Sequence, residues 1–229
     1  MRYAALATDY DGTIAHDGAV DHATVDALRR LRASGRHLIM VTGREMSDLL
    51  ATFAHCELFE RIVAENGAVL YEPLSARARI LSPTPPPEFV AALRAKNVPV
   101  SVGRSVVATV EPYEHAVLDA IRELGLEWHV IFNKGSVMAL PAGITKATGL
   151  KPALEELKLS ANQTVGVGDA ENDHAFLTMC GLSVAVANAL PAVKAEVDWV
   201  TSGARGAGVT ELIERWLVDD FEGIKAKSR

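Results

Sequence analysis

The stretch LATDYDGTIA, residues 6–15, joins a short apolar run to two aspartates that stand one residue apart. An apolar run of this length that stops at charged residues is typical of a buried strand in a parallel sheet. On a straight strand the side chains at positions i and i+2 share a face, so the charges of Asp9 and Asp11 would repel each other there. Packing does not explain such a pair, and we interpret both carboxylates as parts of a functional site.

Around this stretch the composition is that of an ordinary globular protein. The chain has 229 residues, of which 49% are hydrophobic and 23% charged, and its formal net charge is −6. Such an acidic chain offers no basic surface for nucleic acid or for an anionic membrane. We find no secretory leader, no apolar run of membrane-spanning length, and no metal-ligand spacing at the two cysteines, Cys56 and Cys180. We therefore expect a cytoplasmic protein with buried free thiols.

Strand-like apolar runs alternate with segments of helical period along most of the chain. The dipeptide Asn66-Gly67 predicts a tight turn between two short apolar runs. This alternation predicts an α/β fold with a Rossmann-like parallel sheet. Strands are expected at residues 3–9, 36–43, 163–169 and 182–188, and helices at residues 21–35, 45–56, 171–180 and 209–218.

The pattern changes at the segment SPTPPPEF, residues 82–89, which contains four prolines and suggests a domain edge. Beyond it we expect a helix at residues 88–96, one strand at residues 100–110, a helix at residues 113–124 and further strands at residues 127–141. After residue 141 the parallel pattern returns. We therefore predict a core formed by residues 1–82 and 141–229, interrupted by a small α+β domain at residues 83–140.

Polar side chains directly follow three of the expected strands. Because ligands bind at the carboxyl ends of the strands in open parallel sheets, we expect these side chains to meet. A polar residue at one strand end often caps the next helix, but three such ends in one domain point to a shared site. Converging carboxylates need a cation, and oxygen donors favour Mg²⁺ over Zn²⁺, which prefers His and Cys. The residues are Asp9 and Asp11, Thr42 and Gly43, and Asp169 with Asn172 and Asp173.

Four segments, taken in order, resemble the motifs of the Mg²⁺-dependent phosphatases in the haloacid dehalogenase superfamily. They are DYDGT (residues 9–13), VTGR (41–44), PAGITKATGL (141–150) and GVGDAENDHAFL (166–177). The insert between the second and third motifs, together with AENGA at residues 64–68, resembles the Cof-like branch, which carries an α/β cap. Archaeal-type phosphoglycolate phosphatases and sucrose-phosphate phosphatases are similar in layout.

The resemblance implies a role for each matching residue. Asp9 is expected to attack phosphorus as the nucleophile and to form an aspartyl-phosphate. Asp11 is expected to protonate the leaving alkoxide and then to activate water. Thr42 and Lys146 are expected to act in catalysis by holding the transferring phosphoryl group. The implied phosphate contacts are Thr42, Gly43, Lys146 and Asn172, and the implied Mg²⁺ ligands are Asp9, Asp11, Asp169 and Asp173.

Three nearby polar residues receive structural interpretations: Arg44 at a helix start, Asn66 in a turn and Asp48 on an exposed helix face. The cap is expected to exclude water and to select the leaving group. Because it is short, we expect a small phosphorylated metabolite, such as a sugar phosphate or phosphoglycolate, bound by a monomer or homodimer. The candidate cap contacts are Arg104, Tyr113, His129, Asn133 and Lys134, for each of which a surface or packing role is the simpler interpretation.

Three alternatives remain open at this point. A phosphomutase or phosphotransferase of the same superfamily needs arginines in the cap to hold a second phosphate, and the insert has only Arg94, Arg104 and Arg122. A phospho-accepting domain of the receiver type gathers similar residues but lacks the insert. A phosphatase fold that only binds ligands would not need the full set of catalytic residues. Hydrolysis is therefore the favoured reaction.

Overall fold

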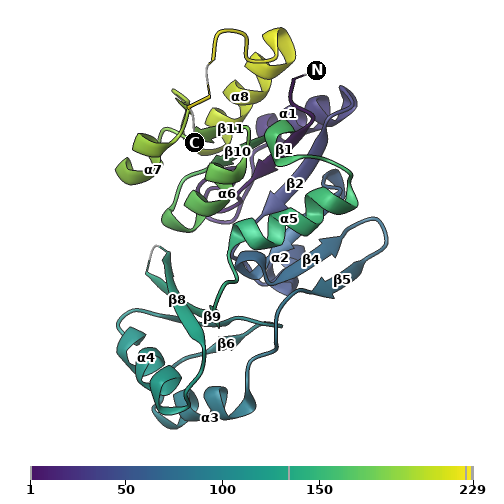
Figure 1. The fold of residues 1–229 in the computed structure, drawn as a ribbon. Coiled ribbons are helices and arrows are strands. Elements are labelled where there is room, and N and C mark those ends of the chain that lie inside the picture. Colours follow the sequence, from purple (N-terminus) through teal and green to yellow (C-terminus); the bar gives the residue numbers. More distant parts are fainter. Residues whose placement is uncertain (1, 134, 225, 228–229) are drawn as a thin grey trace.

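The computed structural model describes residues 2–133, 135–224 and 226–227. The chain forms an eight-stranded sheet in the order β12-β11-β10-β1-β2-β3-β4-β5 and a separate four-stranded sheet (Figure 1). The strands of the larger sheet are β1 (Ala5–Thr8), β2 (His37–Val41), β3 (Arg61–Ala64), β4 (Val69–Glu72), β5 (Arg77–Ile80), β10 (Thr164–Gly168), β11 (Leu182–Ala185) and β12 (Trp199–Val200).

The strand that precedes the paired aspartates lies at the centre of this sheet. β1 pairs in parallel with β2 on one side and with β10 on the other, so that Ala5 lies beside both His37 and Thr164. The remaining strands from β12 to β3 are also parallel, while β4 and β5 add an antiparallel edge. The α/β prediction with a parallel Rossmann-like sheet is therefore confirmed, and the ends of β1, β2 and β10 meet at one edge.

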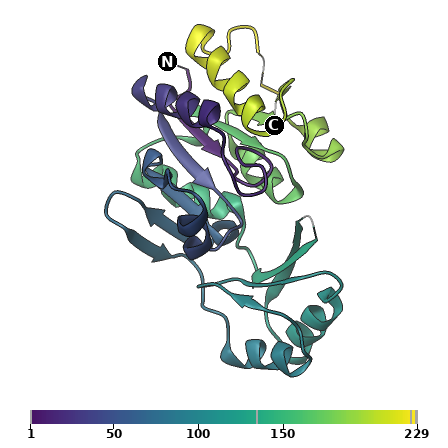
Figure 2. The same ribbon diagram turned by 180° about the vertical axis from the view of Figure 1, so that it is seen from behind.

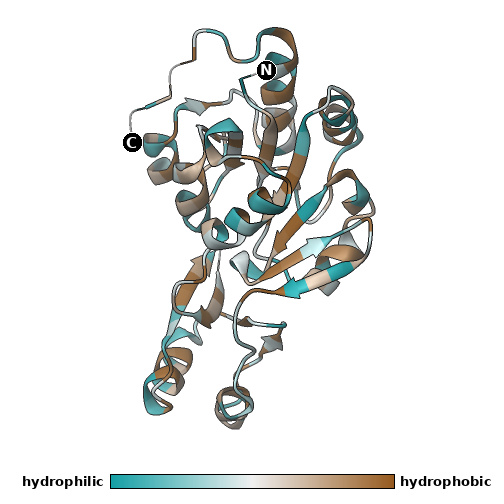
Figure 3. Ribbon diagram, turned by 45° about the vertical axis from the view of Figure 1, so that its right-hand side comes forward, coloured by the Kyte–Doolittle hydropathy of each residue, from teal (hydrophilic) through white to brown (hydrophobic). Residues whose placement is uncertain are grey.

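Helices cover both faces of the larger sheet because its strands are apolar on both sides. Successive residues of β1 point to opposite faces: Leu6 belongs to a buried cluster with Leu28 and Trp216, and Ala7 to a second cluster with Leu150. In Figure 3 the central strands are mostly hydrophobic, whereas the helices alternate between hydrophobic and hydrophilic residues. The helices on the first face are α1 (His22–Ala33), α2 (Met46–Thr52) and α8 (Arg205–Asp219), and those on the second are α5 (Lys146–Glu156), α6 (His174–Met179) and α7 (Pro191–Glu196).

The insert folds around an antiparallel sheet in the order β6-β7-β9-β8. Phe89 and Val117 of its two helices pack with Val137 on one face, and Met138 and Leu140 on the other face contact Ala68 of the core. Figure 2 shows these helices at the end of the molecule farthest from the N-terminus. The elements are α3 (Pro87–Ala95), β6 (Ser101–Val102), β7 (Val107–Val110), α4 (Glu114–Glu123), β8 (Trp128–Asn133) and β9 (Ser136–Pro141).

Several local predictions differ from the structure. The single strand expected at residues 100–110 is wrong, because a turn closed by the Gly103 N–H and the Val106 carbonyl divides it into β6 and β7. The helix expected at residues 45–56 ends at Thr52, and the last long helix begins at Arg205 rather than at residue 209. β5 and α7 were not predicted, since both are short and lack a clear apolar period.

Other local predictions are confirmed. Asn66-Gly67 does form the turn between β3 and β4, which pair antiparallel. Cys56 and Cys180 are both buried as thiols that are not joined in a disulfide. Among the residues that the structure describes, none of the helices combines the length and apolar character that a membrane crossing requires.

Candidate active site

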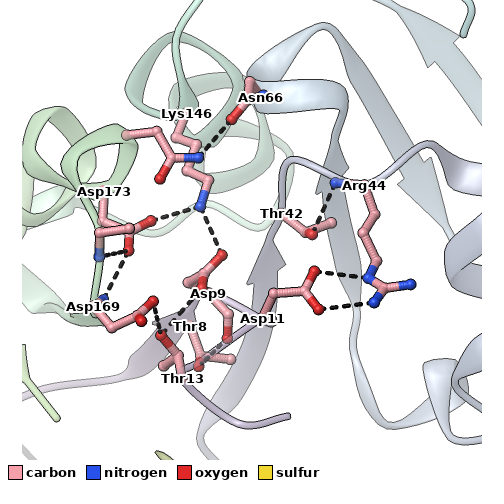
Figure 4. A network of polar contacts seen from close by, with 12 residues as sticks. Thr8, Asp9, Asp11, Thr13, Thr42, Arg44, Asn66, Lys146, Asp169 and Asp173 are labelled. Atoms are coloured by element: carbon pink, nitrogen blue, oxygen red, sulfur yellow. Dashed lines mark hydrogen bonds and ion pairs between the residues drawn. The ribbon is translucent and has the colours of Figure 1, made fainter. Parts of the chain in front are cut away.

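The chain turns sharply where β1 ends. β1 stops at Thr8, and the residues after it curl around the carbonyl oxygen of Tyr10, which accepts three backbone N–H groups. Asp9 and Asp11 therefore do not share a strand face. Figure 4 shows that Asp9 points toward the N-terminus of α5, whereas Asp11 points toward the loop after β2. This divergence separates two charges that a straight strand would have held side by side.

Lys146 lies between two buried carboxylates. It is the first residue of α5, behind the N-cap Thr145, whose hydroxyl accepts the N–H of Thr148. The Lys146 side chain is 1% exposed, and its Nζ lies 2.6 Å from Asp9 Oδ1 and 2.5 Å from Asp173 Oδ1. Both contacts are charge-assisted hydrogen bonds (Figure 4). A cation and two anions buried together are costly to desolvate, which marks this cluster as a candidate site.

Asp173 supports the loop after β10 as well as the lysine. Its Oδ2 accepts the backbone N–H groups of Asp169, at 2.8 Å, and of Ala170, at 3.0 Å. Its Oδ1 accepts the lysine, so protein donors engage both oxygens of this buried carboxylate. Asp173 therefore fixes the positions of Lys146 and Asp169 relative to each other.

Three carboxylates form a set of donors that fits a hard cation. Asp9, Asp169 and Asp173 are buried and offer oxygens that all lie within 4.8 Å of one another. The hydroxyl of Thr13 lies 3.1 Å from Asp9 Oδ2 and 3.2 Å from Asp169 Oδ1, and its single proton serves only one of them. One lysine does not balance three carboxylates, and oxygen donors alone are the ligands that Mg²⁺ prefers. The set therefore fits Mg²⁺, with Asp9 and Asp169 as the side chains best placed to hold it.

Asn188 ties this set to the turn after β1. Its Nδ2 donates to the carbonyl oxygen of Gly12 at 2.8 Å and approaches Asp169 Oδ2 at 3.4 Å. Its Oδ1 accepts the backbone N–H of Arg205 at the start of α8. We did not single out Asn188 from the sequence, although it follows the strand β11 and the same strand-end rule applies to it.

The electrostatics of the buried cluster follow from its surroundings. Burial and the neighbouring Asp173 carboxylate raise the pKa of Asp9 to about 7, against the opposing effect of Lys146. Burial alone would lower the pKa of Lys146, but Asp173 and Asp9 outweigh that effect and the pKa is raised. The lysine is therefore charged at neutral pH. A cation beside Asp9 would favour the ionised carboxylate that a nucleophile requires.

Arg44 holds Asp11 on the other side of the site. Its Nε donates to Asp11 Oδ2 at 2.7 Å and its Nη2 to Asp11 Oδ1 at 2.8 Å, while Nη1 reaches Asp48 at 2.6 Å. The interpretation of Arg44 as a helix-start residue is wrong, because α2 begins at Met46 behind Glu45 and the guanidinium binds a site carboxylate instead. The sequence did carry a signal for this contact, because Arg44 places a charge two residues after Thr42, close to the end of β2. Asp48 lies on a half-exposed helix face, as expected.

Thr42 and Gly43 directly follow β2, which ends at Val41. Thr42 is buried, and its Oγ1 accepts the backbone N–H of Arg44 at 3.1 Å (Figure 4). Gly43 lines the cavity described below. The loop after β2 therefore brings both predicted phosphate contacts to the same edge of the sheet as Asp9.

The side chains of Asn172, a predicted phosphate contact, and Asn66, a predicted turn residue, are hydrogen-bonded to each other. Asn172 Nδ2 donates to Asn66 Oδ1 at 2.9 Å, and Asn66 Nδ2 lies 3.2 Å from the sulfur of Met138 in β9. Asn66 has the left-handed φ of 53° that its turn requires, as predicted, but it is also fully buried. It thus connects the loop after β10 with the insert, a role that the sequence did not reveal.

A cavity of about 400 Å³ lies between the core and the β8–β9 hairpin of the insert. Of the predicted cap contacts, Asn133 lines it, whereas Tyr113 packs against the hydrophobic core of the insert and Arg104 lines a different groove. His129 is half-buried, and burial lowers its pKa. Lys134 lies outside the described residues. The cavity is lined by Asp9, Asp11, Gly43, Arg44 and Asp48 of the core and by Asn133, Ser136 and Met138 of the insert.

Comparisons with known proteins agree with this arrangement. A profile of the haloacid dehalogenase-like hydrolases matches residues 6–105 and 119–213. The phosphoglycolate phosphatase of Methanothermobacter thermautotrophicus is 30% identical over 225 residues, which cover 93% of this chain and 98% of that protein. A haloacid dehalogenase-like hydrolase from Bacteroides thetaiotaomicron has a TM-score of 0.80 at 19% identity, over 93% of this chain and 99% of that one. A subclass IIB sugar phosphatase of the superfamily has a TM-score of 0.74 at 20% identity, over 93% and 97%.

At 19% and 20% identity, the two solved structures show a shared fold alone. The family profile covers most of the chain and includes the segments that hold Asp9, Thr42, Lys146 and Asp169. The archaeal relative aligns over nearly its whole length, with the insert included. The chain therefore belongs to the haloacid dehalogenase-like hydrolase family, in the Cof-like branch of its phosphatases.

Proposed function

We propose that this chain is a Mg²⁺-dependent phosphatase that hydrolyses a small phosphate monoester through an aspartyl-phosphate on Asp9. The observation that carries the proposal is the position of Asp9. Its carboxylate lines the cavity and accepts a hydrogen bond from the buried Lys146. One of its oxygens lies within 4.8 Å of an oxygen of Asp169, close enough for both to hold one ion. Asp11 lines the same cavity from a different direction. Two carboxylates thus face one space, and Asp9 is also in contact with the buried cation and belongs to the candidate metal set.

In the first half-reaction, an oxygen of Asp9 forms a bond to phosphorus as the bond to the ester oxygen breaks. The departing oxygen takes the proton of the Asp11 carboxyl group and leaves as an alcohol. Arg44 engages both Asp11 oxygens and so orients the carboxyl group, which also lines the cavity.

In the second half-reaction, Asp11 takes a proton from a water molecule as the water oxygen attacks the phosphorus of the aspartyl-phosphate. The bond between Asp9 and phosphorus breaks, which releases inorganic phosphate and restores the Asp9 carboxylate. Throughout, the Lys146 ammonium and the Thr42 hydroxyl stabilise negative charge on the phosphoryl oxygens. Mg²⁺, held by Asp9 and Asp169, would supply the further positive charge that draws a dianionic phosphate to an acidic site.

We propose residues 83–140 as the cap of this site and a small phosphorylated metabolite as its substrate. The cavity of about 400 Å³ admits a molecule of the size of phosphoglycolate or a sugar phosphate, and Asn133 and Ser136 of the insert offer it polar contacts. The relative from Methanothermobacter thermautotrophicus, which is named a phosphoglycolate phosphatase, supports phosphoglycolate as the substrate. A phosphomutase is disfavoured, because Arg44 is the one arginine among the described lining residues and Asp11 and Asp48 already engage it. Buried cysteines that are not joined in a disulfide fit the reducing cytoplasm as the place of action.

The test is release of inorganic phosphate by the purified protein from phosphoglycolate, hexose phosphates and p-nitrophenyl phosphate, with Mg²⁺ and with EDTA. We expect turnover of at least one small ester that EDTA abolishes and Asp9→Asn removes. Conversion of glucose 1-phosphate to its isomer without phosphate release would establish a mutase instead. A long-lived aspartyl-phosphate with no turnover of any ester would establish a phospho-accepting domain.

A further inference from the structure

Glu65 is a buried carboxylate that takes no part in the proposed chemistry. It begins the short turn η2 (Glu65–Gly67) between β3 and β4 and is 1% exposed. Its φ of 51° and that of Asn66, 53°, are both left-handed, which is unfavourable for residues other than glycine. Two such residues in succession persist only where the surrounding contacts hold them.

The Glu65 carboxylate binds the insert rather than the core. Its Oε1 accepts the backbone N–H of Arg104 at 3.1 Å, and its Oε2 accepts those of Ser105 at 2.8 Å and Val106 at 3.2 Å. These three residues form the turn between β6 and β7. A Cβ on Gly103 would lie 2.7 Å from Glu65 Oε2, so only glycine permits this approach. One buried anion thus satisfies three successive donors of the insert with charge-assisted bonds.

The rest of the same turn reaches the candidate active site. The side chain of Asn66 contacts Asn172 and Met138, and Met138 lines the cavity from the insert. A Cβ on Gly67 would lie 2.0 Å from the carbonyl oxygen of Thr145, the residue before Lys146. The turn is therefore in contact with the insert on one side and with the start of α5 on the other.

We infer that Glu65 is a positioning residue that holds the cap over the cavity and so limits the size of the leaving group. Besides its two connecting segments and the polar contacts of Glu65, Asn66 and Glu45, the cap meets the core in a small apolar cluster, which comprises Ala68, Val106, Met138 and Leu140. Apolar contact of this kind is non-directional, whereas three hydrogen bonds to one carboxylate fix the cap in one orientation. The inference rests on the proposed function, because it assigns the cap a role in substrate choice.

The chain offers a matched control at the same boundary between the core and the insert. Glu45 of the core accepts a hydrogen bond from the hydroxyl of Ser101 in β6, in an exposed position. Glu45→Gln therefore removes a charge that also joins the core to the insert, but one that water can replace. Glu65→Ala removes the buried anion, and Glu65→Gln keeps its shape with weaker acceptors.

The experiment measures amide hydrogen exchange at residues 103–107 and the turnover of phosphoglycolate and p-nitrophenyl phosphate by each variant. In Glu65→Ala we expect the amides of residues 104–106 to exchange at least about tenfold faster, because the carboxylate that accepts their hydrogen bonds is gone. We expect the KM for phosphoglycolate to rise about tenfold with kcat within about threefold, since the reacting groups are untouched. The ratio of p-nitrophenyl phosphate to phosphoglycolate turnover should rise. Glu65→Gln should give exchange rates, KM and turnover ratios between those of the wild type and of Glu65→Ala. Glu45→Gln should give the wild-type values.

Unchanged exchange in Glu65→Ala, or faster exchange with the selectivity and KM unchanged, would overturn the inference. So would a Glu45→Gln variant that behaves like Glu65→Ala. If Glu65→Ala does not fold, as judged by circular dichroism, the exchange and selectivity of Glu65→Gln decide the question. If the wild type hydrolyses no phosphate ester, the proposed function fails, and the exchange data alone still show whether Glu65 holds the cap.

Discussion

Two clusters of charge reach the wall of the cavity, one through Asp9 and the other through Asp11, and they differ in their access to water. The inner cluster comprises Lys146 with Asp9, Asp169 and Asp173, and the outer cluster comprises Arg44 with Asp11 and Asp48. The side chains that form ion pairs in the inner cluster are at most 6% exposed. Those of the outer cluster are 22–56% exposed. Contacts of similar length therefore have different energetic consequences in the two places.

In the inner cluster, removing one partner leaves a buried charge without compensation, which costs several kcal/mol. In the outer cluster, water and salt replace much of a lost contact, and exposed pairs contribute roughly 0–1 kcal/mol. A substitution in the inner cluster should therefore change folding stability as well as the proposed catalysis. The outer cluster orients Asp11 at little cost to the fold, so its effect should be seen in turnover alone.

The largest effect is expected for Asp9→Asn. An amide oxygen is a poor nucleophile, so turnover should fall by about 10⁴-fold or more. The fold should survive, because Lys146 retains Asp173 and one of the repelling carboxylates is gone. Phosphate release and urea unfolding measure the two quantities, with Asp48→Asn as the control of equal charge change. Retention of more than a few per cent of activity would refute Asp9 as the nucleophile.

Lys146→Met should cause the largest loss of stability. Two buried carboxylates would lose their cation, and we expect the free energy of unfolding to fall by about 3–5 kcal/mol at neutral pH. Activity should be lost as well. Lys151→Met, at an exposed position of the same helix, should leave both quantities unchanged. If the two variants unfold at the same urea concentration, the inner cluster does not contribute to folding.

The pH dependence of folding stability should also distinguish the inner cluster from the outer one. The pKa of Asp9 is raised to about 7, above its ordinary value of 3.8, so between these values the folded state binds a proton that the unfolded state has released. In EDTA the stability contributed by Asp9 should therefore fall as pH rises from about 4 to about 7, and Asp9→Asn should lack this decline. Urea unfolding of both proteins at pH 5 and pH 7.5 tests this. Parallel changes in the two proteins would contradict it.

Arg44→Lys should have the smallest of these effects on the fold and a clear effect on turnover. Lysine keeps the charge but does not form the bidentate clamp on Asp11, so we expect kcat to fall by about tenfold. The free energy of unfolding should change by less than about 1 kcal/mol. Asp48→Asn leaves the clamp intact and should keep kcat within about twofold. A loss of stability in Arg44→Lys as large as in Lys146→Met would erase the distinction between the clusters.

The strand-end argument predicted from local patterns which side chains of the candidate site would meet. It identified Asp9, Thr42 and Asp169 because each follows a buried apolar run, and parallel strands bring such ends to one edge. Asn188 was missed only because the same rule was not applied to β11. Arg44 was misassigned because a helix start and a carboxylate clamp leave the same mark in a sequence. Nothing near Glu65 indicated that its carboxylate would bind the insert.

The sequence by itself determined the α/β class, the strands after which the carboxylates lie and the break in the parallel pattern after residue 82, because apolar period and turn residues act over short distances. Only the tertiary structure decided the partner of each charge. Lys146 reaches Asp9 across 137 positions of the chain, and Glu65 reaches Ser105 across 40. Two carboxylates that look alike in DYDGT are distinguished by burial, which is a property of the folded chain. Asp9 pairs with a lysine that is almost fully buried, and Asp11 pairs with an arginine that is partly exposed.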